Sequence, residues 1–180
     1  MSLLPAIRLV QSLSGSEKRF FKLNTRQQSG EKDYQKLFDI ICSSGPQSEE
    51  IAMRFKTAFP KSNVDNTARY LVRVLTDCLI QQRTQKDGFF QLFQGIMRVK
   101  VLQERALPEE GYRELKRIRE NANRHQQHFI EYLTYRYELD HLSGTGFADV
   151  SDSQLVQTQM KAREVLKSMN HVQDHHSLFE

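Results

Sequence analysis

The chain has 180 residues, of which 38% are hydrophobic and 27% are charged, and it contains only eight glycines and four prolines. This composition is typical of a soluble helical protein and is too rich in large apolar residues for a disordered chain. The longest uncharged stretches reach roughly ten residues, about half of a membrane span, and the N-terminus lacks the basic region of a signal peptide. We therefore expect a cytoplasmic protein without a membrane segment.

The charge is divided unevenly along the chain. Residues 1–86 contain 14 Lys/Arg and 8 Asp/Glu, whereas residues 87–180 contain 12 and 14. An excess of positive charge in one region is typical of contact with nucleic acid or with an acidic partner. Helical surfaces are also often basic for solubility alone, so the excess does not choose between these interpretations.

Apolar residues recur at helical spacing through the first half of the chain. Ser14 and Glu17 have the spacing of a capping box, and Ser48 and Asn63 stand where they can cap two further helices. A polar loop is expected over 24–32. The predicted helices are Pro5–Leu13, Ser14–Leu23, Asp33–Ser43, Ser48–Phe59 and Asn63–Gln85.

The two cysteines, Cys42 and Cys78, fall on the apolar faces of two of these helices. We expect both to be reduced thiols in the core of a cytosolic protein. The alternative is a disulfide or a metal pair, but no neighbouring residues complete a ligand set.

The second half reads as helices joined in hairpin pairs. Asp87-Gly88 marks the predicted boundary between an N-terminal helical subdomain, residues 1–87, and these pairs, residues 88–180. Because the first of the helices is apolar on almost every side, we expect neighbours to cover two of its faces. No run alternates like a strand, so the predicted class is all-α. The helices are predicted at 89–105, 109–122, 124–142 and 152–173.

Three stretches carry a resemblance to known proteins: LSGSEKRFFKL at 13–23, DYQKLFDII at 33–41 and ARYLVRVL at 68–75. Together they resemble the N-terminal region of a group of uncharacterised bacterial proteins with tetratricopeptide-like helical repeats. Residues 89–142 are similar to the irregular repeats that follow in that group. The resemblance implies a helical bundle cap followed by irregular antiparallel helix pairs, an α-solenoid-like array. Such arrays usually hold another macromolecule.

The best candidates for partner binding lie in the helix predicted at 124–142. His128, Tyr132 and Tyr135 follow one stripe, with Arg136 beside them and Arg98 a neighbour from the helix at 89–105. Tyrosine and arginine are enriched where proteins hold partners, because each offers a large contact area with a polar tip. The alternative is that these tyrosines pack between helices and point their hydroxyls to water.

A second interpretation concerns residues 33–85, whose three helices resemble a helix-turn-helix unit. The third helix could then lie in the major groove of DNA. The alternative is a solvated face in which Arg73 pairs with Asp77 one turn away. The candidate nucleic-acid contacts are Asn63, Asn66, Arg69, Tyr70 and Arg73.

Catalytic and metal motifs are not found. His125 with His128 and His171 with His175 share helix faces, but neither pair has a further ligand at a fixed spacing. Gly144-Thr145-Gly146 lacks the strand and the Lys-Ser/Thr of a phosphate loop. We therefore expect a non-enzymatic protein- or peptide-binding scaffold without cofactor or metal, which could serve in regulation. The alternative is a nucleic-acid-binding regulator.

Overall fold

The computed structural model describes residues 3–26, 32–45, 47–144 and 151–177, with side chains described as far as Asn170 except that of Arg26. Every regular element in these ranges is an α-helix, which confirms the all-α class. The chain divides into two compact units, Met1–Gln85 and Lys86–Glu180. Among the described helices, none has the length and apolar character needed to cross a membrane.

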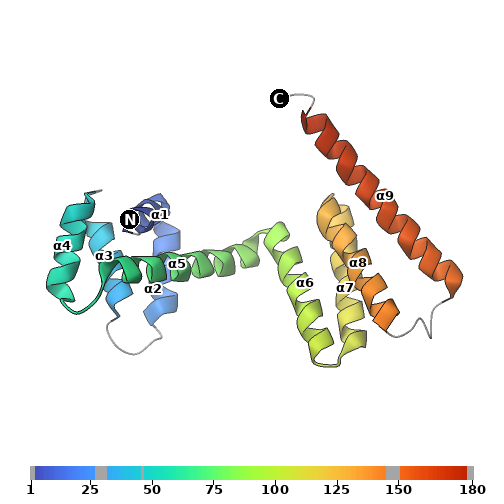
Figure 1. Cartoon of the computed structure of the whole chain (residues 1–180), viewed down its shortest axis with the longest axis horizontal. Helices are drawn as coiled ribbons and strands as arrows, with labels where there is room; N and C mark the ends of the chain where they lie inside the picture. Colours follow the sequence, from blue (N-terminus) through green and yellow to red (C-terminus); the bar gives the residue numbers. More distant parts are fainter. Residues whose placement is uncertain (1–2, 27–31, 46, 145–150, 178–180) are drawn as a thin grey trace. The chain divides into compact units, whose positions relative to one another are not determined.

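In the first unit, α1, α3 and α4 contact one another, and α5 runs crosswise to α2, α3 and α4 (Figure 1). Phe21 and Phe38 pack together in its core, with ring centroids 4.5 Å apart. Leu71 and Leu75 of α5 belong to the same core. The helices are α1 (Leu3–Ser12), α2 (Gly15–Arg26), α3 (Asp33–Ser43), α4 (Ser48–Ala58) and α5 (Val64–Lys86).

Two of the three predicted N-terminal caps of these helices are present in the structure. Ser14 and Glu17 form the predicted capping box: the Ser14 amide donates to the Glu17 carboxylate at 2.8 Å, and the Glu17 amide donates to the Ser14 hydroxyl at 3.3 Å. The hydrogen bond from the Ser14 amide lowers the pKa of Glu17. Asn63 also caps its helix as predicted, accepting from the Asp65 and Asn66 amides. Ser48 does not cap α4, because it is already the first helical residue.

The second unit places α6, α7 and α8 side by side, and α9 packs on α8 (Figure 1). Its core lies among the first three helices, where Gly95 allows close approach: a Cβ at this position would lie 2.8 Å from Ile118. The helices are α6 (Gly88–Glu104), α7 (Pro108–Arg124), α8 (His128–Gly144) and α9 (Asp152–Ser177). Its buried core residues are Leu92, Ile96, Val99, Leu115, Ile118, Ala122 and Ile130.

One turn occurs twice in this unit. Helices α6, α7 and α8 each have 17 residues, and three residues separate each from the next. Ala106 and Gln126 occupy the left-handed region in these turns, with φ of 56° and 54°. In each turn the next residue's amide reaches back to the helix: Leu107 to the Leu102 carbonyl at 3.0 Å, and Gln127 to the Ala122 carbonyl at 2.8 Å. These bonds satisfy carbonyls that the helix end leaves open.

Three expectations need correction. Helix α8 begins at His128, because residues 123–124 still belong to α7 and a turn follows. Helix α6 buries only one face, since Phe89, Met97 and Val101 on other sides are exposed. Cys42 is exposed, so it is not a core thiol; both cysteines are free.

Candidate partner-binding site

A groove of about 300 Å³ lies between α8 and α9 in the second unit. Its charged lining residues are Arg136 from α8 and Arg163 from α9, so each wall of the groove contributes one positive charge. Tyr132 adds an aromatic ring at the α8 wall. The other lining residues are mainly apolar: Leu139, Gln159, Ala162 and Leu166.

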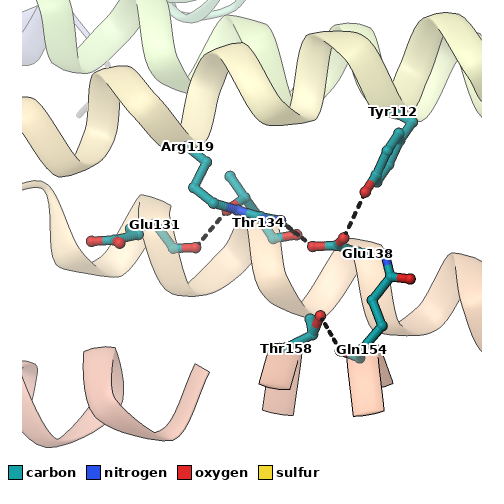
Figure 2. Close-up of polar contacts among 7 residues, drawn as sticks. All are labelled: Tyr112, Arg119, Glu131, Thr134, Glu138, Gln154 and Thr158. Atoms are coloured by element: carbon teal, nitrogen blue, oxygen red, sulfur yellow. Dashed lines mark hydrogen bonds and ion pairs between the residues drawn. The ribbon is translucent and has the colours of Figure 1, made fainter. Parts of the chain in front are cut away.

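Small residues bring α9 against α8. Thr158 and Ala162 are buried and stand four residues apart, so both occupy one face of α9. The Thr158 hydroxyl donates to the Gln154 carbonyl at 3.0 Å within the same helix (Figure 2), so this buried hydroxyl has a hydrogen-bond partner. Of the two buried residues, Ala162 also lines the groove.

Buried polar groups hold α8 on its other side, against α7. Figure 2 shows Arg119 of α7 reaching three groups of α8: the Thr134 hydroxyl at 3.0 Å, the Thr134 carbonyl at 3.3 Å and the Glu138 carboxylate. Tyr112 donates from its hydroxyl to the same carboxylate at 3.0 Å. Thr134 is 0% exposed and Glu138 only 5%. A buried carboxylate needs such donors, because burial without them is costly.

A second set of contacts continues this network toward the start of α8. The Asn123 side-chain Nδ2 donates to the Glu131 carboxylate at 3.0 Å, and His128 Nδ1 lies 3.7 Å from the other oxygen of that carboxylate. The Arg119 guanidinium also stacks 4.0 Å from the centre of the Tyr135 ring. Burial raises the pKa of Tyr135 and of Tyr112, and the bond to Glu138 raises that of Tyr112 further. With one face fixed in this way, α8 presents Tyr132 and Arg136 to α9.

The five predicted partner-binding residues do not form one surface. Tyr132 and Arg136 come together in the α8–α9 groove. Tyr135 is buried beneath Arg119, and His128 is half-buried beside Glu131. Arg98 lies in a groove between α6 and α7, where it pairs with Glu114 at 3.8 Å. The structure thus brings two of the five together.

The groove residues of α9 were not among the sequence candidates. Leu166 is an apolar residue of α9 that is 39% exposed. Arg163 resembles any surface arginine in the sequence. The sequence gives no signal for Leu166 or Arg163, because their place in the groove depends on which helix packs against α9.

A larger pocket of about 580 Å³ lies at the ends of α6 and α8. Its lining includes Lys100 and Asp140, which have opposite charge, together with His141 and Tyr137. The charged lining of this pocket is therefore of mixed sign, whereas that of the α8–α9 groove is positive only.

The candidate nucleic-acid residues form a separate surface on α5. Asn66, Arg69, Tyr70 and Arg73 are all exposed and follow one another over two helical turns, and Asn63 precedes them as the cap. The Arg69 guanidinium donates to the Asn66 side chain at 2.9 Å. The Arg73 guanidinium lies 5.0 Å from the centre of the Tyr70 ring.

The histidine pairs do not form metal sites in the described residues. His125 follows α7 as its C-cap and His128 begins α8, so the two do not share a helix face. His171 and His175 lie outside the described side chains. Over the side chains that are described, no cluster of three or more potential ligands occurs.

A scan against known protein families, a search of curated proteins and a search of solved structures each find no match for this chain.

Proposed function

We propose that the chain is a non-enzymatic scaffold that binds a peptide segment of another protein in the α8–α9 groove. The observation that carries this proposal is the pairing of Arg136 and Arg163 on opposite walls around Leu139, Ala162 and Leu166. Apolar walls bury aliphatic side chains, and guanidinium groups bind carboxylates through two parallel hydrogen bonds. The expected ligand therefore combines apolar residues with an acidic one.

The charge of the groove remains available to a ligand. Arg136 lies 3.7 Å from Asp140, and both side chains are more than half exposed. Exposed pairs of this kind are worth about 0–1 kcal/mol, so a ligand carboxylate can compete for the guanidinium. Asp140 also faces the other pocket and does not line the α8–α9 groove.

Regular helix pairs support the idea of a tetratricopeptide-like scaffold. Helices α6, α7 and α8 each have 17 residues, and the chain reverses direction between them through the same type of turn. Stacked helix pairs of this kind present extended grooves to their partners. The irregularity proposed from the sequence then lies in α9, which has 26 residues.

The test uses the full chain and three labelled twelve-residue peptides followed by fluorescence anisotropy. One peptide combines leucine with glutamate, the second combines leucine with lysine, and the third combines serine with glutamate. We expect the leucine–glutamate peptide to bind at least about tenfold more tightly than either of the others, because only it satisfies both kinds of wall.

The matched variants separate the groove from general charge. Arg136→Ala with Arg163→Ala should abolish the preference, and Leu166→Glu should do the same by placing an acid inside the groove. Arg105→Ala with Arg124→Ala removes the same charge from exposed positions outside the groove and should leave binding unchanged. Equal weakening in both double variants, or no peptide binding at all, would reject the groove as the site.

A further inference from the structure

The N-terminal half of α5 carries an exposed ridge that the proposed peptide groove does not use. Asn66, Arg69, Tyr70 and Arg73 lie at relative positions 0, 3, 4 and 7, which places them on one helix face. Tyr70 is 42% exposed despite its aromatic ring. We refer to these four residues as the α5 ridge.

Both arginines of the α5 ridge have neutral partners. Arg69 is bound by the Asn66 amide oxygen, and Arg73 lies over the Tyr70 ring. In the part of the chain that the structure describes, no carboxylate lies within ion-pair distance of either guanidinium, and the predicted Arg73–Asp77 pair does not form. Other arginines of the chain do pair with glutamates: Arg54 with Glu50 in the first unit, and Arg98 and Arg117 with Glu114 in the second. The positive charge of the α5 ridge is therefore not neutralised internally.

The opposite face of α5 holds the ridge in place. Ala68 and Leu71 are completely buried in the core of the first unit. The Thr67 hydroxyl donates to the Asp33 carboxylate of α3 at 3.1 Å, and the Tyr34 and Tyr70 rings meet edge to face at 5.2 Å. The ridge side chains thus project from a helix whose rotation is fixed by its own core.

We propose that the α5 ridge binds double-stranded DNA by entering its major groove. An α-helix with its side chains is about 10–12 Å in diameter, and the major groove, about 12 Å wide, admits a helix of that diameter. Arg69 and Arg73 would bind phosphates through their planar guanidinium groups, while Asn66 lies at the helix start, where base edges are contacted. Lys61 is exposed and lies two positions before the Asn63 cap, so it adds a positive charge at the same end of α5.

The charge of the unit agrees with this partner. Met1–Gln85 contains 13 Lys/Arg against 8 Asp/Glu. A ridge on a single helix enters a groove of its partner, whereas an acidic peptide is better held in a groove of the protein, as proposed for α8 and α9. Shape and charge together favour duplex DNA over an acidic protein segment.

The experiment measures binding of the full chain to a fluorescein-labelled 20-base-pair duplex of mixed sequence between 50 and 250 mM salt. Each phosphate contact contributes about 0.9 to the slope of log affinity against log salt. Replacing Arg69→Gln and Arg73→Gln should lower that slope by about 2 and weaken binding at 100 mM salt at least tenfold. The control, Arg105→Gln with Arg124→Gln, carries the same charge change in the second unit and should bind as the unchanged chain does.

A second variant separates loss of DNA binding from loss of the fold. Asn66→Glu places an acid in the first turns of α5, where the helix dipole favours it, yet it should repel phosphates and weaken DNA binding. Circular dichroism of each variant should match that of the unchanged chain. The proposal is overturned if the chain does not bind the duplex at 50 mM salt, or if ridge and control variants weaken equally. It is also overturned if a polyglutamate peptide binds as tightly as the duplex and loses affinity in the same ridge variants.

Discussion

At the scale of single residues, Glu138 illustrates how the second unit is held together. Its side chain is 7% exposed, and its carboxylate accepts hydrogen bonds from Arg119 and Tyr112 of the neighbouring helix. Thr134 beside it uses its hydroxyl twice, accepting from Arg119 and donating to the Glu131 carbonyl at 2.7 Å. The network satisfies its buried groups, and it also fixes which face of α8 is left for the groove.

Removing the cation of this network should destabilise the second unit strongly. Arg119→Met keeps a side chain of similar length but leaves Glu138 buried without a positive partner, at a cost of about 3–5 kcal/mol. Urea unfolding followed by circular dichroism measures this loss. The double variant Arg119→Met with Glu138→Leu should recover most of the stability, because an apolar pair has no charge to compensate. A loss below about 1 kcal/mol in the single variant would contradict the structural role of the network.

At the scale of elements, the turns after α6 and α7 use residues that are unusual for their conformation. A left-handed φ at this position of a helix end is most often supplied by glycine, since a Cβ there is crowded by the following carbonyl. Ala106 and Gln126 take it instead, with φ of 56° and 54°. Each turn nonetheless forms its backbone hydrogen bonds, so the strain is compensated locally.

Glycine at either turn should therefore stabilise the protein. Ala106→Gly and Gln126→Gly should each raise the free energy of unfolding by about 0.5–1 kcal/mol, because relief of the strain exceeds the added freedom of the unfolded chain. The matched control is Gln157→Gly at an exposed position within α9, which should lower it by roughly 1 kcal/mol. Thermal unfolding of the three variants gives the sign of each change, and destabilisation by the turn variants would be the opposite result.

At the scale of the whole molecule, the chain contains two separate hydrophobic cores. The core of the first unit includes Phe21, Phe38 and Leu71, whereas that of the second includes Ile96, Leu115 and Ile118. No residue belongs to both clusters in the described part of the chain. Each unit therefore has its own source of apolar stabilisation.

Two cores predict two unfolding transitions that respond to different substitutions. Leu71→Ala and Leu115→Ala each remove a buried leucine side chain, at a cost of about 2–5 kcal/mol. For a unit of this size, such a loss lowers the transition temperature by roughly 10 °C or more. We expect each variant to shift one transition observed by calorimetry and leave the other in place. A single transition that both variants lower equally would contradict this prediction.

Local patterns in the sequence determined most of the helices. The bounds of α3, Asp33–Ser43, agree with the prediction, because its apolar positions recur at helical spacing and residues 44–47 interrupt them. The Ser14–Glu17 capping box and the Asn63 cap were likewise predicted, since each depends on residues within three positions of the helix start. Helix bounds and caps could be predicted because they depend on residues that are close together in the sequence.

The tertiary structure decided which residues those helices leave available. Tyr132 and Tyr135 stand three positions apart on α8, yet one lines the groove and the other lies beneath Arg119, because different helices pack on the two sides of α8. Arg163 became a candidate only when α9 was found against α8. The start of α8 at His128 also depended on the turn that lets it pack back on α7. Helix periodicity gives the direction of a side chain about its own axis, but contact requires a neighbour whose position is set by packing between distant segments.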